Sequence, residues 1–389
     1  MTTEVLFASM RSRSLNPDHS FVGKYRETIQ KLGIPESVKD KNVMIKLHLG
    51  SHLGFTTVHP FLVGELARLI KKAGGRPFAV DTIEGFYAAT ARGYTPEVIG
   101  CPIFPVAGPR ENYFLTREIN YKSISEIKLG GTLQDADVLV DLSHVKGHNT
   151  EGFGAAIKNL AIGMLVSESR SKMHDVMQFD RYWFSEKCEN PRSHTKLCPF
   201  GALKYNEKKM CLSIDFDMCN QCMRCVEATK QEGCLQVNQV NFASFPEANA
   251  LSTKETLSFF DEKERFYINV GINITVVCDC WGITTGNILP DLGVLGSRDI
   301  VAIDKATLDL LADKPLIQEN VPQSLEIVRD GRLHPFQEVH GPYKDPYLLP
   351  MFCEKYGLGK MKYEITEIQP PAPEAKLTPS RFPKPKKLF

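Results

Sequence analysis

Three cysteines stand at three-residue steps in one short stretch, CNQCMRC, which supplies Cys219, Cys222 and Cys225. This spacing lets a short loop present three thiolates to one iron–sulfur cube. A four-iron cluster needs four thiolates, and in the common run the fourth cysteine follows after three residues and precedes a proline. That position holds Thr229 here. The fourth ligand therefore has to come from elsewhere in the chain.

The stretch CPFGAL, which begins at Cys198, has the form of the end of a ferredoxin motif. In two-cluster ferredoxins the fourth cysteine of each run ligates the other cluster. We therefore expect one [4Fe–4S] cluster on Cys198, Cys219, Cys222 and Cys225. Cys234 is an alternative fourth ligand, as a cysteine displaced by an insertion. A zinc ribbon is the alternative kind of site, but its ligands come as two C-x₂-C pairs.

Composition limits what else the chain can be. With 389 residues, of which 42% are hydrophobic, it can bury one large core and carry a second module. The 47 basic and 46 acidic residues give a net charge of +1. A chain so balanced has no electrostatic footprint for nucleic acid or an anionic membrane, and we expect neither partner.

The N-terminal stretch MTTEVLFASMRSR lacks the apolar core of a signal peptide. The longest apolar run, near 160–166, is too short to span a bilayer. These features predict a cytoplasmic protein. Its eleven cysteines then favour metal or redox chemistry over disulfides.

Strand-like and helix-like segments alternate before the cysteine-rich stretch and again after it. The predicted strands are 4–9, 42–48, 77–81, 138–142, 272–277 and 300–303, and the predicted helices are 61–73, 154–163, 255–265 and 305–311. Such alternation predicts an α/β fold, a mostly parallel sheet with helices on both faces.

The same pattern predicts the domain organisation. We expect an α/β domain in two parts, 1–185 and 243–340, interrupted by a ferredoxin-like iron–sulfur insertion at 186–242. A C-terminal extension at 341–389 ends in the Pro- and Lys-rich stretch KLTPSRFPKPKKLF, which predicts an extended tail.

Polar residues that could do chemistry lie where predicted strands end. In open α/β sheets, ligands bind at the carboxyl ends of the strands. Four strand ends carry such residues: Lys46 with His48, Asp81, Lys146 with His148 ahead of a helix that carries Lys158 and Asn159, and Cys278 with Cys280.

Lys146, His148 and Lys158 form the strongest of these groups, because they place several cations on one loop and its helix. Together with the helix N-terminus they predict a site for a carboxylate or phosphate, with His148 or His48 as proton donor. Gly152 and Gly154 would let the backbone approach a ligand closely.

For the other groups a structural role is an open alternative. Asp81 could cap the next helix, which is a common role for aspartate. Lys46 and His48 could form the solvent face of an edge strand. Cys278 and Cys280 could be a half-buried pair of ordinary thiols.

In chain order, the stretches IKLHLG, TTVHP, FAVDT, VKGHNTEGFGAAIKNLAIG, CPFGAL, CNQCMRC, CDCWG and PDLGVLGSRDIVAIDKATLDLL resemble those of iron–sulfur proteins of the domain of unknown function 362 family. The resemblance covers about residues 40–315. It implies an α/β domain with a ferredoxin-type insertion, found largely in anaerobic bacteria and archaea. This chain departs from the fuller members because it has no second complete four-cysteine run, so one cluster is expected.

Two functions follow from these observations. The first is an anaerobic oxidoreductase whose cluster passes electrons to an acidic substrate or to a second cofactor of unknown identity, with reduced ferredoxin or a similar protein as the donor. The second is an electron carrier or iron–sulfur scaffold that docks a partner. A pure carrier needs no cleft of converging lysines and histidines, so the polar cluster favours the enzyme. The predicted catalytic residues are Lys46, His48, Lys146, His148 and Lys158, and the predicted cofactor contacts are Asp81, Gly152, Gly154, Asn159, Cys278 and Cys280.

Overall fold

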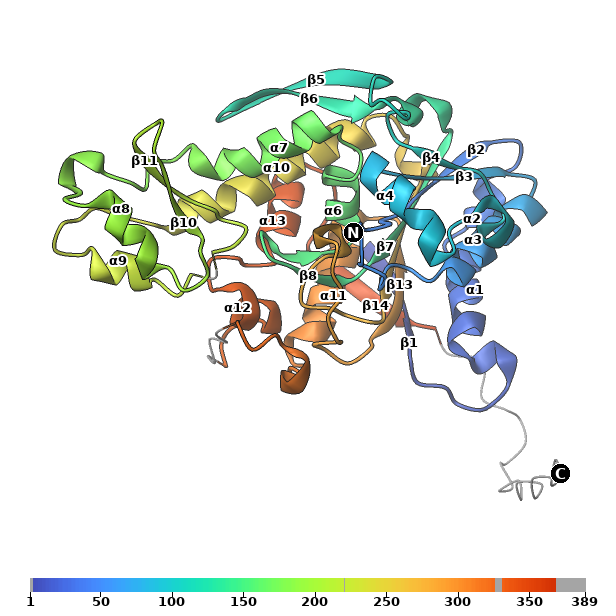
Figure 1. Ribbon diagram of the computed structural model, residues 1–389. Coiled ribbons are helices and arrows are strands. Elements are labelled where there is room, and N and C mark those ends of the chain that lie inside the picture. Colours follow the sequence, from blue (N-terminus) through green and yellow to red (C-terminus); the bar gives the residue numbers. More distant parts are fainter. Residues whose placement is uncertain (1–2, 220, 326–330, 369–389) are drawn as a thin grey trace.

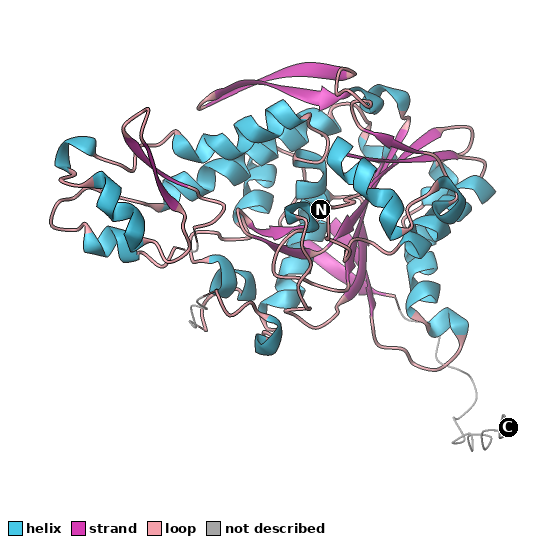
Figure 2. Ribbon diagram, viewed as in Figure 1, coloured by secondary structure: helices cyan, strands magenta, loops and turns pink. Residues whose placement is uncertain are grey.

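An eight-stranded sheet forms the centre of the computed structural model, which describes residues 3–219, 221–325 and 331–368. In spatial order its strands are β14 (Tyr363–Glu367), β1 (Thr3–Ser9), β13 (Gly293–Ser297), β12 (Arg265–Gly271), β7 (Val138–His144), β2 (Asn42–Lys46), β3 (Arg76–Asp81) and β4 (Ile103–Pro105). All neighbouring strands are parallel except β13, which is antiparallel to both β1 and β12. The predicted α/β fold is therefore confirmed (Figure 2).

Helices pack on both faces of this sheet, and each face has its own apolar core. The first core contains residues of α1 (Phe21–Lys31) and α3 (Pro60–Lys72), and the second contains residues of α6 (Ala156–Ala161), α10 (Gln239–Leu257) and α11 (Ile300–Ala312). Along β7, Val138 and Val140 belong to the first core and Leu139 to the second. Alternation of this kind marks a strand that is buried on both faces.

Shorter helices complete the body of the molecule. They are α2 (Ile34–Ser37), α4 (Ile83–Ala89), α5 (Pro96–Ile99), α7 (Ser167–Asp175), α12 (Pro335–His340) and α13 (Leu348–Lys355). Two hairpins stand apart from the main sheet: β5 (Phe114–Tyr121) with β6 (Ile124–Gly130), and β8 (Lys146–His148) with β9 (Gly152–Gly154). Strand β14 comes from the predicted C-terminal extension and forms one edge of the main sheet, whereas the predicted tail at 376–389 lies outside the described residues.

The cysteine-rich stretch forms a lobe at one end of the molecule, drawn in yellow-green in Figure 1. It contains the antiparallel pair β10 (Leu203–Asn206) and β11 (Cys211–Ile214) and the short helices α8 (Pro191–His194) and α9 (Arg224–Ala228). Phe216 of the lobe packs edge-on against Phe242 of α10, with ring centroids 5.1 Å apart. Helix α10 then runs back into the body, so the lobe is joined to the α/β part by a continuous apolar contact.

Three predicted elements were wrong, all after the cysteine-rich stretch. Residues 272–277 form a loop that follows β12, and its apolar side chains Ile274 and Val276 are buried without being part of a strand. Residues 300–303 open α11 because the Asp299 carboxylate accepts from the N–H groups of Val301 and Ala302, both at 2.9 Å, and so caps a helix there. The helix predicted at 255–265 is replaced by the end of α10 and the start of β12.

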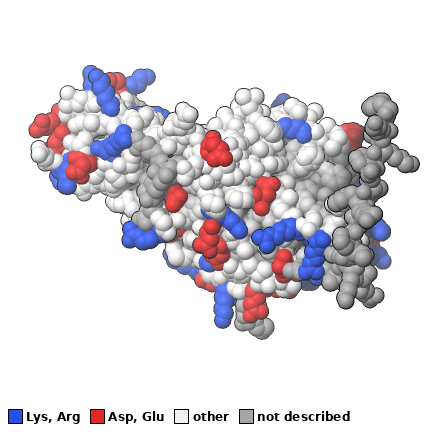
Figure 3. Space-filling view, turned by 90° about the horizontal axis from the view of Figure 1, so that it is seen from below, with Lys and Arg blue, Asp and Glu red and all other residues white. Residues whose placement is uncertain are grey.

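The surface carries both charge signs. On the face drawn in Figure 3, basic and acidic side chains are interspersed. Within the ranges that the structure describes, no helix combines the length and the apolar composition needed to cross a membrane.

Candidate functional site

The carboxyl ends of the parallel strands meet at one edge of the sheet, where a buried ion pair joins two of them. Lys46 ends β2 and Asp81 ends β3, and the Lys46 Nζ lies 2.9 Å from the Asp81 Oδ1. Both side chains are buried. Burial would raise the pKa of Asp81, but the nearby charges of Lys46 and His48 hold it below its usual value. Lys46 therefore holds the framework of the site together; it does not line the cavity described below.

Asn159 connects this ion pair to β7. Its Oδ1 accepts from the Lys46 Nζ at 3.0 Å, and its Nδ2 donates to Asp141 Oδ1 at 2.6 Å. Burial raises the pKa of Asp141 to about 7, although the hydrogen bonds from Ser143 and Asn159 oppose the shift. One buried polar network thus lies beneath the strand ends and contains Lys46, Asp81, Asn159 and Asp141. Asp141 was not among the residues predicted from the sequence.

A cavity of about 1110 Å³ opens above this network. Six of the predicted site residues line it: His48, Lys146, His148, Lys158, Asn159 and Cys280. The strand ends bring together side chains that are far apart in the sequence: His48 and Cys278, which are in contact, are 230 residues apart.

Two lysines meet at the floor of the cavity. A Cβ atom added to Gly154 would lie 3.1 Å from the Lys158 side chain and 3.6 Å from that of Lys146, so a residue without a side chain leaves room for both. Burial lowers the pKa of Lys146. Burial acts in the same direction on Lys158, but the thiols of Cys278 and Cys280 and the carboxylate of Glu151 outweigh it and raise the Lys158 pKa. Of the two lysines, Lys158 therefore holds its proton and its positive charge more strongly.

Cys278 faces His48 and Lys158 just behind the cavity wall. Its Sγ lies 3.2 Å from the His48 Nε2 and 3.9 Å from the Lys158 Nζ. The other ring nitrogen of His48 lies 3.9 Å from the Asp81 Oδ2. Burial would raise the pKa of Cys278, but hydrogen bonds from Cys280 and His48 and the Lys158 charge hold it well below its ordinary value. The His48 imidazole thus lies between the Cys278 sulfur and the Asp81 carboxylate, an arrangement that can activate a thiol.

Cys280 is exposed where Cys278 is buried. The thiol hydrogen bond that Cys280 gives to Cys278 raises its own pKa well above the ordinary value. Ligand atoms of His48, Cys278 and Cys280 all lie within 4.8 Å of one another, so these residues could hold a metal ion. The two cysteines thus differ in burial and in the direction in which their pKa values are shifted.

Asp279 joins the loop that carries Cys278 and Cys280 to the loop that follows β2. Its Oδ1 accepts from the Thr56 N–H at 3.1 Å and from the Thr56 hydroxyl at 2.8 Å. The His144 Nδ1 lies 3.6 Å from the Asp279 Oδ2. Burial would raise the pKa of Asp279, but the hydrogen bond from His144 and the charge of His144 lower it. The loop that carries Cys278 and Cys280 is therefore held from two strand ends.

At the N-terminus of α6, where an anionic ligand was predicted, the structure places the Asp304 carboxylate of the chain itself. The N–H groups of Ala156 and Ile157 donate to the Asp304 carboxylate at 3.1 and 3.0 Å, so α11 satisfies them internally. Anion binding at this site would have to come from side chains, chiefly Lys158 and Lys146.

Gly152 and Gly154 lie behind the cavity wall and do not border it. Gly152 has a positive φ of 82°, and a Cβ there would lie 2.4 Å from the carbonyl oxygen of Lys344. Its positive φ allows a close approach of the chain to itself.

His148 stands on the β8–β9 hairpin and reaches the cavity. Its Nδ1 accepts from the N–H groups of Thr150 and Glu151, both at 3.3 Å. This arrangement assigns the ring proton to Nε2. Burial and the nearby Lys158 charge hold the His148 pKa well below its ordinary value, so the ring stays neutral and can donate a hydrogen bond.

Two further cavity residues carried no signal in the sequence. Arg170 and His174 lie one turn apart on α7 and both line the cavity. Arg170 makes two hydrogen bonds of 2.6 Å to Glu84 of α4, which holds the two helices together across the opening. The four-residue spacing of these two basic residues is the only pattern that could have indicated them.

The lobe brings the four predicted metal ligands together. Cys198, Cys219, Cys222 and Cys225 line one small hollow, and none of them takes part in a disulfide. Burial and the neighbouring thiols raise the pKa of Cys225 to about 11. Cys234, the alternative fourth ligand, is bonded instead to Cys188. This disulfide also corrects the expectation that the cysteines would stay unpaired.

The loop that carries Cys219, Cys222 and Cys225 contacts the cavity wall through Asp217. The Asp217 Oδ2 lies 3.2 Å from the Nδ1 of His174, which lines the cavity, and its Oδ1 accepts from the Thr150 hydroxyl at 2.5 Å. Lys344 donates to the carbonyl oxygen of Cys219 at 2.6 Å and also to that of Asn149. The loop that carries Cys219 therefore rests on the hairpin that carries Lys146 and His148.

Comparison with known proteins gives a family and little more. The search among curated proteins finds no match. One solved structure that matches is the lactate racemase apoprotein from Thermoanaerobacterium thermosaccharolyticum, with 11% sequence identity and a TM-score of 0.33. The match covers 69% of this chain and 50% of the racemase, so the chain spans about half of that protein's length. A likeness of this size carries no conclusion about fold or activity.

The family model described as "Domain of unknown function (DUF362)" matches residues 43–309, which contain the strand ends, the cavity lysines and the cysteine lobe. This match covers well over half of the sequence. The chain belongs to the DUF362 family.

Proposed function

We propose that the protein is an iron–sulfur oxidoreductase: a [4Fe–4S] cluster on Cys198, Cys219, Cys222 and Cys225 delivers electrons to an acidic molecule held in the cavity. The observation that carries the proposal is the contact between the two sites. Asp217, two residues before Cys219, meets His174 on the cavity wall. A cluster held by this loop would be linked to the cavity wall through Asp217 and His174.

The surroundings of the four cysteines support a cluster. Backbone N–H groups point at three of the four sulfur atoms: Ala202 donates to Cys198 at 3.2 Å, Gln221 to Cys219 and Val226 to Cys225. Hydrogen bonds to the sulfur atoms are one of the features that tune iron–sulfur clusters. When bound, the cluster supplies single electrons. The protein residues supply everything else.

Lys158 and Lys146 bind the acidic part of the ligand. Both are buried at the cavity floor, where a fixed ammonium group interacts with a carboxylate or phosphate more strongly than it does in water. His148 adds a neutral N–H donor. A substrate with one acidic group at Lys158 and a reducible group toward His48 would fit this arrangement.

His48 holds the proton that a reduction consumes. It lies between the Cys278 sulfur and the Asp81 carboxylate, at 3.2 Å and 3.9 Å. His48 also borders the cavity, whereas Cys278 lies behind it. After His48 has given up its proton, it can take up another from solvent at the opening of the cavity.

Electrons would enter through the lobe, with a reduced ferredoxin or a similar carrier as the donor. An alternative is that the protein is itself an electron carrier. A carrier would require only the cysteine lobe, and would leave unexplained a cavity of about 1110 Å³ with two buried lysines.

The test is anaerobic purification followed by mass spectrometry of small molecules that remain bound. We expect an acidic compound with the wild-type protein and its loss in Lys158→Met and Lys146→Met, with iron content and melting temperature little changed. Lys172→Met is the matched control, because Lys172 lies on α7 but pairs with Glu168 outside the cavity. Unfolding of both cavity variants, or full retention of the compound by both, would move the carrier function ahead.

A further inference from the structure

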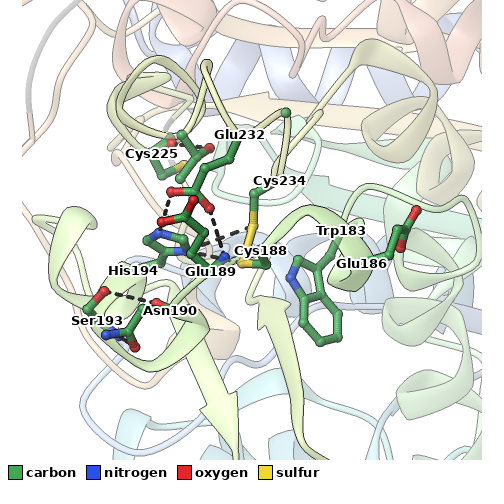
Figure 4. Close-up of a disulfide and its surroundings, with 12 residues drawn as sticks. Trp183, Glu186, Cys188, Glu189, Asn190, Ser193, His194, Cys225, Glu232 and Cys234 are labelled. Carbon is green, nitrogen blue, oxygen red and sulfur yellow. Dashed lines mark hydrogen bonds and ion pairs between the residues drawn. A yellow bond between two sulfur atoms is a disulfide. The ribbon is translucent and has the colours of Figure 1, made fainter.

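A second group of sulfur and nitrogen atoms lies in the lobe, apart from the four cysteines above. Cys188 and Cys234 form a disulfide across 46 residues, with Cα atoms 5.0 Å apart. His194 and Glu232 complete the group, and ligand atoms of all four residues lie within 4.8 Å of one another. Figure 4 shows the imidazole of His194 between the disulfide and the Glu232 carboxylate.

The position of this group follows from the ferredoxin motif. Cys188, Pro191, His194 and Cys198 have the spacing of a C-x₂-C-x₂-C-x₃-C-P run, with proline and histidine in the second and third places. In a two-cluster ferredoxin the fourth cysteine of the other run would join the first three positions. Cys234 takes that part here. The four residues thus gather where a second cluster would lie.

The donors do not fit a second four-iron cluster. Two of the four cysteine positions of that site are proline and histidine, and its two remaining sulfur atoms are bonded to each other. The site therefore retains two cysteines of the motif but lacks the four thiolate ligands that a four-iron cluster needs.

His194 is placed to move a proton at these sulfur atoms. Its Nδ1 lies 3.2 Å from the Cys188 Sγ and 3.8 Å from the Cys234 Sγ, and its Nε2 lies 3.3 Å from the Glu232 Oε1. A carboxylate at Nε2 favours the tautomer with its proton there, which leaves Nδ1 to exchange a proton with sulfur. This is the geometry of a thiol beside its general base.

The two sulfur atoms differ in access. Cys234 is fully buried, and its segment is fixed by backbone hydrogen bonds from Phe184 to Cys234 at 2.9 Å and from Gln236 to Tyr182 at 2.8 Å. Cys188 is partly exposed and follows the short turn Ser185–Lys187. An incoming thiol can therefore reach Cys188, whereas Cys234 can act only from within.

From this geometry we propose that Cys188 and Cys234 form a redox-active disulfide that exchanges with dithiols. A thiolate of the dithiol attacks the Cys188 Sγ, the disulfide bond breaks, and Cys234 leaves with the electron pair and takes a proton by way of His194. The second thiol of the reductant then attacks the mixed disulfide and releases Cys188. The protein disulfide gains two electrons and two protons, and the dithiol becomes a disulfide.

The experiment uses the full chain with its metal content intact, equilibrated without oxygen in mixtures of reduced and oxidised dithiothreitol. Alkylation and mass spectrometry then report the state of each cysteine. We expect Cys188 and Cys234 to become reduced together and to reoxidise together. His194→Asn should slow opening at neutral pH by roughly 100-fold and change its pH dependence, with iron content unchanged. Cys211→Ser, in the same lobe, is the control and should behave as wild type.

Two single variants test which sulfur is attacked. With Cys234→Ser, added oxidised glutathione should give a stable mixed disulfide at Cys188; with Cys188→Ser, Cys234 should remain unmodified. The only indole near the disulfide is that of Trp183, drawn beside it in Figure 4, so its fluorescence in a Trp281→Phe background should follow the same redox transition.

Either of two results would overturn the proposal. One is a disulfide that dithiothreitol opens only when the protein unfolds, which would make it a structural cross-link. The other is one zinc or iron ion bound at these residues, beyond any metal on the other four cysteines, and lost in Cys188→Ser. Neither result depends on the cavity variants above, so this proposal and the proposed function can fail separately.

Discussion

The Sγ atom of Cys278 lies 3.2 Å from the Nε2 atom of His48, although the two residues are 230 positions apart. Burial opposes a thiolate at Cys278, but the hydrogen bonds from Cys280 and His48 and the Lys158 charge prevail and hold its pKa well below the ordinary value. We therefore predict thiolate absorbance in the ultraviolet at neutral pH that Cys278→Ser removes. His48→Asn should move the titration to higher pH. Identical spectra of wild type and Cys278→Ser at neutral pH would show that the thiol is protonated.

The ligand set of the lobe predicts unequal effects of two cysteine variants. Cys198→Ser should lower iron content sharply, because Cys198 shares one hollow with Cys219, Cys222 and Cys225. Cys234→Ser should leave it nearly unchanged, because Cys234 is bonded to Cys188. Iron analysis of both variants, purified side by side without oxygen, measures this. The reverse ranking would make Cys234 the fourth ligand.

The raised pKa of Asp141 predicts how the free energy of unfolding depends on pH. Burial raises its pKa to about 7 from its ordinary value of 3.8. The folded protein therefore binds this proton more tightly than the unfolded chain, so the contribution is complete below about pH 4 and is lost as pH rises through about 7. Asp141→Asn should remove this loss, which is roughly 1 to 4 kcal/mol between pH 4 and 8.

Melting temperatures of the two proteins across that range provide the measurement. The wild type should lose stability toward pH 8 more steeply than Asp141→Asn. Parallel curves would mean that Asp141 is ionised in the folded protein and that Asn159 and Ser143 compensate its burial completely.

Metal removal should loosen the lobe more than the body. Among the described residues between Cys219 and Gly233 few side chains are buried in the core, and Gln221 and Met223 hold positive φ angles of 60° and 59°. Ordering of this loop would come mainly from ligation. Limited proteolysis should cut metal-free protein within this loop first, while the eight-stranded sheet survives. Equal resistance of metal-free and metal-loaded protein there would show that packing alone orders the loop.

The cavity could be predicted from the sequence because strand ends of a parallel sheet converge. By this rule Lys146, His148 and Lys158 were expected together, and all three line the cavity. Lys46 was predicted as a catalytic residue, with the solvent face of an edge strand as the alternative. That alternative is wrong, because β2 lies between β7 and β3 and Lys46 is buried; Lys46 does not line the cavity.

Other contributions had no local signal. Asp304 caps α6 from a helix nearly 150 residues away, and nothing around either residue predicts that contact. Asp141 sits in a run of apolar residues that is typical of a buried strand, and its partner Asn159 is found only in three dimensions. Helix α7 carries mostly polar residues, so nothing in its composition indicates that Arg170 and His174 line a site.

The central claim is tested most directly by iron and acid-labile sulfide analysis of the full chain purified without oxygen. A four-iron cluster beside the cavity predicts about four irons and four sulfides per chain, and a broad visible absorption that bleaches on reduction. One zinc per chain with no iron would contradict it.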